Sequence, residues 1–292
     1  MISPLPGAFG GSDASAAITE WTMLTTRILA PNPGPMTLDG TNTFIVRKPD
    51  SHGLVVVDPG PLDANHLRRI TAMGRTELVL LTHHHHDHSA SAARLSALTG
   101  APVRAADPQL CIAGDPLRDG EEILAAGTRI HVLSTPGHTS DSVCFQLPLD
   151  RTLEDRSRAA SVLTGDTILG RGTAVLDSAG GGSLVDYLAS LARLTELGAV
   201  PALPAHGPMI ANLAALATVY TRHRLRRTAD IERAIRALQS AVPPRPVTVE
   251  EIADVVYADA PANVRFAAEA NVAIHLDYLA ARDDSTKQGE HG

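Results

Sequence analysis

The stretch Thr82-His83-His84-His85-His86-Asp87-His88 follows the apolar run 78–81 and contains the pattern H-x-H-x-D-H. Neutral imidazoles and a carboxylate are the ligands that zinc and neighbouring transition metals prefer. Because side chains alternate along an extended chain, those of residues 83 and 85 share one face, whereas 87 and 88 lie past the strand end and can turn toward a second position. The stretch therefore predicts a metal site, and its geometry suggests two metal ions.

A histidine-rich run can also be an expression tag or a solvated patch. Tags lie at chain termini, whereas this run lies between a predicted strand and a predicted helix. His84 and His86 occupy the spacer positions, so we do not expect them to be metal ligands. They could line the mouth of the site.

The composition excludes several classes of protein. With 292 residues, of which 44% are hydrophobic, the chain can bury a full core as one large domain, or as one domain with a small appendage. Residues 1–30 lack a signal-peptide pattern and no apolar run reaches membrane-spanning length, so we expect a cytoplasmic protein with no membrane association. Cys111 and Cys144 lie outside any C-x-x-C pattern, which argues against a disulfide framework or a thiolate metal site.

Short apolar or β-branched runs that end in turn residues predict strands between residues 23 and 208. These runs are 44–46, 53–58, 77–82, 103–105, 129–133, 143–147, 161–163 and 200–203. Helical stretches at 89–98 and 184–197 lie between them, and the charged stretch 150–158 is typical of a solvated hairpin loop. Strands interleaved with helices predict an α/β layered domain.

The chain divides into three predicted segments. Residues 1–20, rich in Gly, Ala and Ser, are expected to be a flexible N-terminal segment, and 21–210 the catalytic domain. Residues 211–292 are predicted to be helical: a helix to about 241, a Pro-rich break at 243–246, a helix opened by the capping box of Thr248 and Glu251, and a longer helix over 262–281. This outline is winged-helix-like, although such a bundle could serve only to pack against the catalytic domain.

Two metal ions would need more ligands than the histidine-rich stretch supplies. Three candidates follow predicted strands: His138 in T-P-G-H-T, Asp166 in L-T-G-D-T and His206 in L-P-A-H-G. Strand ends are where α/β sheets place their sites, and the adjacent Gly and Pro residues fix tight turns. A lone histidine after a strand is usually structural, but these three in this order after H-x-H-x-D-H are a strong signal.

With these motifs, residues 23–210 resemble the metallo-β-lactamase superfamily. The resemblance implies an αββα sandwich, and an aspartate at Asp58 that orients a ligand histidine. It also implies two divalent metal ions, zinc first, with iron or manganese as alternatives. The implied ligands are His83, His85 and His138 for the first ion, Asp87, His88 and His206 for the second, and Asp166 as the bridge. Asp87, which could steer the nucleophile, and Asp166 are the expected catalytic residues.

The residue type at Asp166 also indicates which branch of the superfamily the chain resembles. β-Lactamases with a thiolate ligand carry Cys at this position, whereas a bridging carboxylate resembles the glyoxalase II and nuclease branches, so β-lactam hydrolysis becomes a minor alternative. A closer resemblance lies in N-P-G-P-M-T-L-D-G-T-N-T-F at 32–44, with V-V-Y at 255–257 and N-V-A-I-H-L at 271–276. This is similar to the β-lactamase-like protein 2 family, which includes an endoribonuclease and polyketide thioesterases and carries a winged-helix-like C-terminal domain.

The implied mechanism is hydrolysis by a hydroxide that bridges the two metal ions. The first hypothesis for the substrate is single-stranded RNA, because six arginines in the helical region could hold phosphates. They are Arg222, Arg224, Arg226, Arg227, Arg233 and Arg236. The net charge of −7 and an aromatic content of only 3% argue against it, and the arginines could equally form a solvated helix face.

The second hypothesis is hydrolysis of a small-molecule thioester or related ester, which the same site and the acidic, aromatic-poor composition would suit. A third hypothesis, from a different class, is a nucleic-acid-binding module with a vestigial site. The complete set of ligands makes this the weakest of the three. The sequence points to no protein partner and leaves the metal identity and the oligomeric state open.

Overall fold

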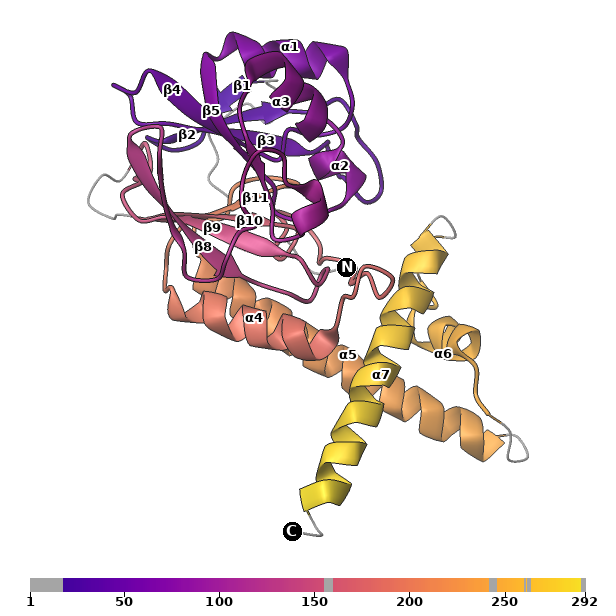
Figure 1. The fold of residues 1–292 in the computed structure, drawn as a ribbon. Coiled ribbons are helices and arrows are strands. Elements are labelled where there is room, and N and C mark those ends of the chain that lie inside the picture. Colours follow the sequence, from indigo (N-terminus) through magenta and orange to yellow (C-terminus); the bar gives the residue numbers. More distant parts are fainter. Residues whose placement is uncertain (1–17, 155–159, 242–245, 260, 262–263, 290–292) are drawn as a thin grey trace.

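The computed structural model describes residues 18–154, 160–241, 246–259, 261 and 264–289. Two β-sheets face each other, and helices cover both outer faces (Figure 1). The predicted αββα sandwich is therefore confirmed. Within the described residues no helix combines the length and the apolar character that crossing a bilayer requires.

The first sheet has six strands in the order β1-β2-β3-β4-β5-β6, antiparallel from β1 to β4 and parallel from β4 to β6. Helices α1 (Ala64–Ala72) and α3 (Ala92–Thr99) pack on its outer face. The strands are β1 (Ile18–Glu20), β2 (Thr25–Leu29), β3 (Asn42–Val46), β4 (Gly53–Val57), β5 (Arg75–Leu80) and β6 (Val103–Arg104).

The second sheet has five strands in the order β11-β10-β9-β8-β7, of which only β10 and β11 pair in parallel. Helices α4 (Leu184–Glu196) and α5 (Leu213–Ala241) cover its outer face. Its strands are β7 (Glu122–Ala125), β8 (Thr128–Ser134), β9 (Val143–Leu147), β10 (Ser161–Gly165) and β11 (Ala202–Pro204). Two short helices, α2 (His86–Ser89) and the 3-10 helix η1 (Pro108–Leu110), follow β5 and β6.

Because side chains alternate along a strand, each buried strand sends one set of side chains into the core between the sheets and the other set toward the outer helices. In β4, Val55 and Val57 point into the core between the sheets, whereas Leu54 and Val56 point toward α1 and α3. Each fully buried side chain of this size stabilises the fold by about 1.5 to 3 kcal/mol. The continuous apolar runs of β4 and β5 are therefore what fixes the central layers and, with them, the strand ends that carry the site.

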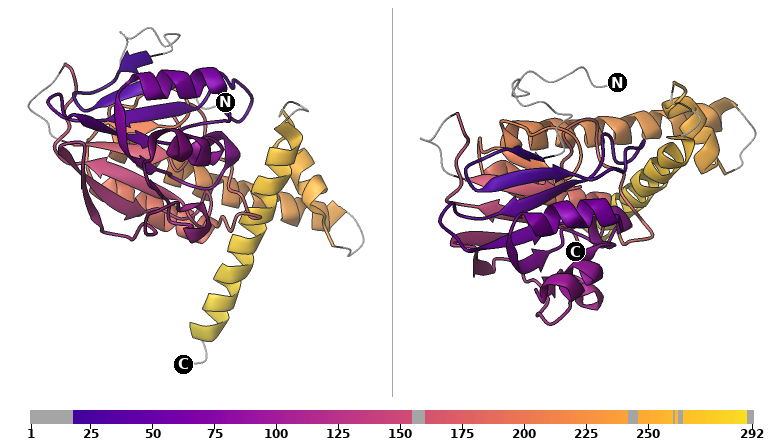
Figure 2. Two further views of the ribbon diagram at one scale, coloured as in Figure 1. Left: turned by 45° about the horizontal axis from the view of Figure 1, so that its top comes forward. Right: turned by 90° about the horizontal axis from the view of Figure 1, so that it is seen from above.

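The C-terminal helices form a module of their own at the far end of α5 (Figure 2). The first half of α5 packs beside α4, and its second half packs through Ile231 against Ile252 of α6 (Val249–Val256) and Val272 of α7 (Arg265–Gly289). The predicted capping box is present, with the Thr248 hydroxyl 3.3 Å from the Glu251 amide and the Glu251 carboxylate 3.0 Å from the Thr248 amide. α5 therefore joins the sandwich to the module as one continuous helix.

Two expectations about boundaries need correction, and a third stays a prediction. Most of the flexible segment predicted at 1–20 lies outside the described residues, but 18–20 form the edge strand β1. The last helix begins at Arg265 and continues to Gly289, beyond the predicted end at 281, while 262–263 lie outside the described residues. The division between domains at residue 210 stays a prediction, because α5 contributes to both packing units.

Asp150, expected in a solvated loop, is fully buried. Its carboxylate accepts hydrogen bonds from the Thr22 hydroxyl at 2.6 Å, the Leu24 amide at 3.0 Å and the Ser161 hydroxyl at 2.5 Å. Burial raises its pKa, and the hydrogen bonds from Ser161 and Thr22 oppose that rise. Asp150 therefore ties the loop after β9 to the β1–β2 connection; residues 155–158 of the same stretch lie outside the described part of the chain.

Candidate metal centre

The seven side chains predicted as metal ligands meet at one edge of the sandwich. Four follow β5, and one each follows β8, β10 and β11, so every one of them lies just beyond the end of a strand. Gly165 ends β10 with φ +49°, and a Cβ there would lie 2.8 Å from the side chain of Thr82. Glycine at this position therefore lets the turn that carries Asp166 pass close to the loop after β5.

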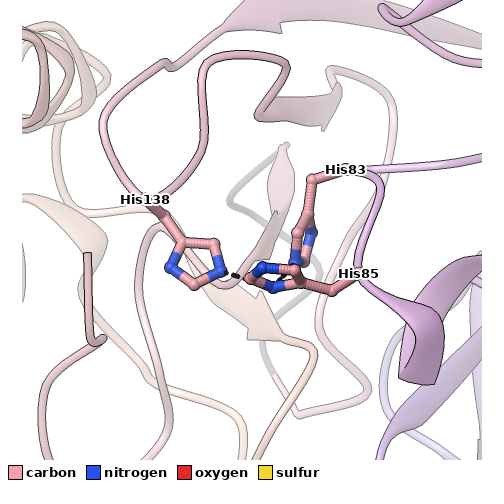
Figure 3. A group of neighbouring side chains, drawn as sticks. All are labelled: His83, His85 and His138. Carbon is pink, nitrogen blue, oxygen red and sulfur yellow. Dashed lines mark hydrogen bonds between the residues drawn. The ribbon is translucent and has the colours of Figure 1, made fainter. Parts of the chain in front are cut away.

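The first group consists of three imidazoles. Nδ1 of His85 lies 3.0 Å from Nε2 of His83 and 3.1 Å from Nε2 of His138, and the three rings point toward one another (Figure 3). Such short separations between ring nitrogens suit ligands that share a metal ion, since zinc–nitrogen bonds are about 2.0 to 2.1 Å long. The arrangement matches the set predicted for the first ion.

The second group combines a carboxylate with two imidazoles. Oδ2 of Asp87 lies 3.2 Å from Nε2 of His88 and 3.2 Å from Nε2 of His206. Asp166 lies between the groups: its Oδ1 is 3.3 Å from Nε2 of His206, and its Oδ2 is 3.7 Å from Nε2 of His138. One carboxylate thus offers an oxygen to each group, which is the geometry that a bridging ligand needs.

Two buried atoms test whether metal ions fit. Among the described residues, Nε2 of His88 and Oδ1 of Asp166 are buried without a hydrogen-bond partner, although both face the second group. Leaving a buried polar atom unsatisfied costs about 1 to 3 kcal/mol, which a bound cation would remove. Imidazole nitrogens and carboxylate oxygens accept zinc, iron or manganese, so the residues fit two divalent ions of this class.

The two groups differ in protonation. Burial lowers the pKa of His83 well below its usual value, and the neighbouring His88 and His138 lower it further. Burial also lowers the pKa of His138 to about 4, although Asp166 opposes this. Both rings are therefore neutral at pH 7, which is the form that binds a metal ion.

In the second group, opposite charges outweigh the penalty of burial. Burial disfavours charge on His88 and His206, but Asp87 and Asp166 raise the pKa of His88 well above its usual value, and Asp166 raises that of His206 to about 9. Burial likewise disfavours the two carboxylates, yet the facing histidines lower their pKa values below the usual range. Without a metal ion, imidazolium protons balance these carboxylates, and a dication that binds there must displace them.

Asp58 holds His88 from behind, in the role that the resemblance implied. Its Oδ2 lies 2.9 Å from Nδ1 of His88, and the carboxylate also accepts hydrogen bonds from the Thr82 amide at 2.8 Å and the Thr82 hydroxyl at 2.7 Å. Asp58 has a φ of +51°, an uncommon conformation for a residue other than glycine. The backbone strain is offset by these three hydrogen bonds at the end of β4.

Other supporting groups were not anticipated. Oδ2 of Asp177 lies 3.1 Å from Nε2 of His85, and the Val175 carbonyl oxygen lies 2.6 Å from Nδ1 of His138. The Thr41 hydroxyl donates to Oδ2 of Asp87 at 2.9 Å. Partners of this kind fix the orientation of a ligand and raise its basicity. Thr41 lies in the motif at 32–44 and could have been suspected, but no local signal marks Asp177 or a backbone carbonyl.

Neither spacer histidine belongs to these two groups, but His84 forms a further set with His85 and Asp177 whose atoms lie close enough together to hold a cation. Nδ1 of His84 lies 2.8 Å from Oδ1 of Asp141, which also accepts a hydrogen bond from the Thr139 hydroxyl at 2.7 Å. His86 is exposed at the start of α2. His84 therefore ties the loop after β5 to the loop that carries His138.

The six arginines of α5 divide between two that have partners inside the protein and four that lie at its surface. Arg224 is only 2% exposed, and Arg227 lies over the ring of Tyr257 at 4.5 Å while donating to the Val256 carbonyl at 3.0 Å. Arg233 pairs with Asp230 on the same helix. The Arg233 side chain stays 63% exposed, and Arg222, Arg226 and Arg236 are exposed as well. Arg224 and Arg227 are therefore unavailable to phosphates, whereas the other four arginines of the stretch lie at the surface.

Residues 36–206 match the family model of the metallo-β-lactamase superfamily. The chain belongs to the metallo-β-lactamase superfamily. Residues 248–290 match the beta-lactamase associated winged helix domain, so the predicted C-terminal domain is confirmed as well. Members of this superfamily are typically metal-dependent hydrolases, and the chain is a hydrolase of this type.

Several relatives match this metallo-β-lactamase chain over most of its length. The lactamase-like protein vrtG of Penicillium aethiopicum is 34% identical over 89% of this chain and 82% of its own. A beta-lactamase-like protein 2 homolog of Caenorhabditis elegans is 29% identical over 87% and 83%, and an atrochrysone carboxyl ACP thioesterase of Aspergillus chevalieri is 30% identical over 82% and 74%. The crystal structure of a beta-lactamase domain protein from Burkholderia ambifaria has the same fold, with a TM-score of 0.74 at 17% identity over 94% and 92%.

Proposed function

We propose that this chain is a dinuclear metallohydrolase that cleaves acyl thioesters. The observation that carries the dinuclear site is the position of Asp166, whose two oxygens face the two ligand groups separately. Divalent ions in such a site lower the pKa of bound water toward 7 and polarise the oxygen of the scissile group. Zinc is the first choice, with iron or manganese as alternatives.

The accessible members of the site indicate where a substrate would approach. The side chains of His85 and Asp87 are 29% and 26% exposed, whereas those of His88 and His206 are at most 1% exposed. Of the two ligand carboxylates, Asp87 is the more exposed, and the Thr41 hydroxyl fixes its orientation. We therefore assign Asp87 the task of orienting the attacking water. The water oxygen bonds to the acyl carbon, the carbon–sulfur bond breaks and the water proton goes to the departing sulfur, so the products are a carboxylic acid and a free thiol.

A thioester is favoured over a nucleic acid by the charges of the molecule. The net charge is −7, and two of the six arginines proposed to hold phosphates, Arg224 and Arg227, have partners inside the protein, while the exposed Arg233 pairs with Asp230. Nucleic-acid affinity depends mainly on cations that can reach the phosphates. One relative, 30% identical, carries the name of an acyl carrier protein thioesterase.

The test is hydrolysis of acyl-coenzyme A and acyl carrier protein thioesters by the zinc-loaded protein. The release of the free thiol is the quantity measured. The Asp166→Asn variant should lose at least about 100-fold in kcat/KM, because it removes the charge that both groups share. Arg226→Ala, on the exposed face of α5, is the matched control and should keep the wild-type rate. Absence of thiol release across the panel by the wild-type, metal-loaded protein would reject the thioesterase.

Single-stranded RNA is the second candidate, because Arg222 and Arg226 are exposed one helical turn apart on α5. A labelled single strand incubated with wild type, Asp166→Asn and the double variant Arg222→Ala/Arg226→Ala would test it. Cleavage that needs Asp166 and weakens in the double variant would support this substrate. No cutting above background by the wild type would exclude it, and a chain that binds no metal even after growth with zinc would contradict both enzymatic candidates.

A further inference from the structure

The segment between β10 and α4 links the metal centre to the rest of the molecule. It begins with Asp166, and further along, the Val175 carbonyl oxygen lies 2.6 Å from Nδ1 of His138. The Asp177 amide donates to the His138 carbonyl at 2.8 Å, and the Asp177 carboxylate contacts His85. The orientation of the His138 ring therefore depends on where the backbone of residues 174–177 is held.

This backbone is held from the opposite side by Arg224 of α5. The Arg224 guanidinium donates one hydrogen bond to the carbonyl of Ala174 and another, at 2.8 Å, to Oδ1 of Asn271 in α7. Its Cζ lies 5.1 Å from the ring centre of Tyr187 in α4. Because Ala174 precedes Val175, a continuous series of contacts joins Asn271 to His138.

The buried guanidinium of Arg224 restricts movement along this series of contacts between Asn271 and His138. Arg224 is 2% exposed, and among the described residues it forms no ion pair. The Ala174 carbonyl, the Asn271 amide oxygen and the face of Tyr187 are therefore the groups that compensate its charge. If one acceptor is lost, a buried charge is left partly unpaired, so the guanidinium and the backbone bound to it must shift.

A second set of contacts holds the start of the same segment. The Tyr187 hydroxyl donates to the Thr167 carbonyl at 2.7 Å, next to Asp166. The Tyr220 hydroxyl contacts the carbonyls of Leu169 at 3.1 Å and Gly172 at 2.6 Å. These tyrosines belong to α4 and α5. From α7, Asn271 reaches the segment through Arg224, and Ile274 packs in the same apolar cluster as Ile168 and Leu176.

We propose that Arg224 and Asn271 are positioning residues of the metal centre. Through them, α7 of the C-terminal module fixes the 174–177 backbone and thereby the His138 ring. On this proposal, the C-terminal module orients a ligand of the first metal group in addition to packing against the sandwich. The inference rests on the metal centre of the proposed function and is independent of the substrate.

The test measures metal affinity rather than turnover. Co²⁺ is titrated into the chelator-treated full-length protein against a competing chelator, and its visible absorption reports the ligand geometry. Asn271→Ala should weaken binding about 10-fold and alter the absorption band, since supporting partners of metal ligands contribute about 10- to 100-fold in affinity. Asn271→Asp, which retains an acceptor for Arg224, should stay within about threefold of wild type.

Val272→Ala is the matched control, because Val272 is buried between α5, α6 and α7 but belongs to a different face of α7. It should lower thermal stability and leave the Co²⁺ affinity and spectrum unchanged. Wild-type affinity in Asn271→Ala, or an equal loss in Val272→Ala, would overturn the proposal. If Asn271→Ala does not fold, Arg224→Lys replaces it: lysine keeps the charge, but its donors all lie on one nitrogen and cannot reach the two acceptors that separate guanidinium nitrogens bind, so the same loss is expected. A wild-type protein that binds no Co²⁺ would overturn the proposed function together with this inference, whereas equal affinities would overturn this inference alone.

Discussion

At the scale of single residues, the orientation of each ligand is set by the group that forms a hydrogen bond with it on the side away from the metal ions. Asp58 holds His88, Val175 holds His138, and the Thr41 hydroxyl holds Asp87 while accepting a hydrogen bond from Nδ2 of Asn32 at 2.9 Å. Such contacts cost little in the folded state because their polar atoms are already buried in pairs. They decide which ring nitrogen or carboxylate oxygen faces the metal ions.

Thr41→Val tests this support at the second group. The change keeps the shape of the side chain but removes the donor to Oδ2 of Asp87, the oxygen that faces His88 and His206. We expect one of the two metal ions to bind about 10-fold more weakly, with the other unaffected. Isothermal titration with zinc measures both sites in one experiment.

Thr76→Val is a suitable control, since Thr76 is a buried threonine of β5 whose hydroxyl has no hydrogen-bond partner among the described residues. It should bind zinc as the wild type does. Equal zinc titrations for Thr41→Val and wild type would show that Asp87 needs no such support.

At the scale of elements, α5 is the helix that the two packing units share, and α7 lies against its second half. His275 of α7 is fully buried there, with Nδ1 2.9 Å from the Thr228 hydroxyl of α5. Burial and the nearby Arg224 and Arg227 lower the pKa of His275 to about 3. A neutral histidine is therefore built into the contact between α5 and α7.

This contact should lose stability in acid. An unfolded histidine takes up a proton below about pH 6.5, whereas folded His275 stays neutral down to about pH 3, so the stabilisation is complete above pH 6.5 and falls as the pH drops through this window. At pH 5.5 the wild type should have lost about 1.4 kcal/mol more of its free energy of unfolding than His275→Asn, relative to pH 7.5. Urea unfolding at the two pH values measures the difference. Parallel losses in the two proteins would rule out His275 as the cause.

At the scale of the whole molecule, the sandwich brings four strand ends from two sheets to one edge and so gathers carboxylates and imidazoles, whose charges are balanced by imidazolium protons when no metal ion is bound. Asp87 and Asp166 lie together with five histidines in this centre. Metal ions that bind the folded chain and not the unfolded one stabilise the fold by mass action.

Removal of the metal ions should therefore lower the thermal midpoint. At a free metal concentration about 1,000 times the Kd the linkage is worth about 4 kcal/mol, which corresponds to about 8 °C or more for a chain of this size. Thermal unfolding with a chelator, and again after zinc is restored, measures the shift. Asp166→Asn should show a much smaller shift, and superimposable curves for wild type with and without chelator would exclude a metal centre that stabilises the fold.

Local signals in the sequence were sufficient for an α/β layered domain, a helical winged-helix-like C-terminal region and a metal site at the strand ends, and the resemblance carried by these motifs added the αββα sandwich and the full set of seven ligands. Apolar runs fix the strands, and the ligands stand next to Gly, Pro or Asp in turns directly after them. The resemblance to the metallo-β-lactamase superfamily implied the group to which each ligand belongs, and the distances in the structure agree with that grouping.

Apart from Asp58, only the tertiary structure decided which groups hydrogen-bond to the ligands from behind, and what the charged stretches do. Asp177 and His85 are far apart in sequence, as are Arg224 and Ala174, and Asp150 looked solvated until its partners Thr22 and Ser161 were located. The reason is physical: the periodicity of a helix or strand records which face is apolar, whereas the partner of a buried polar group depends on how distant segments pack.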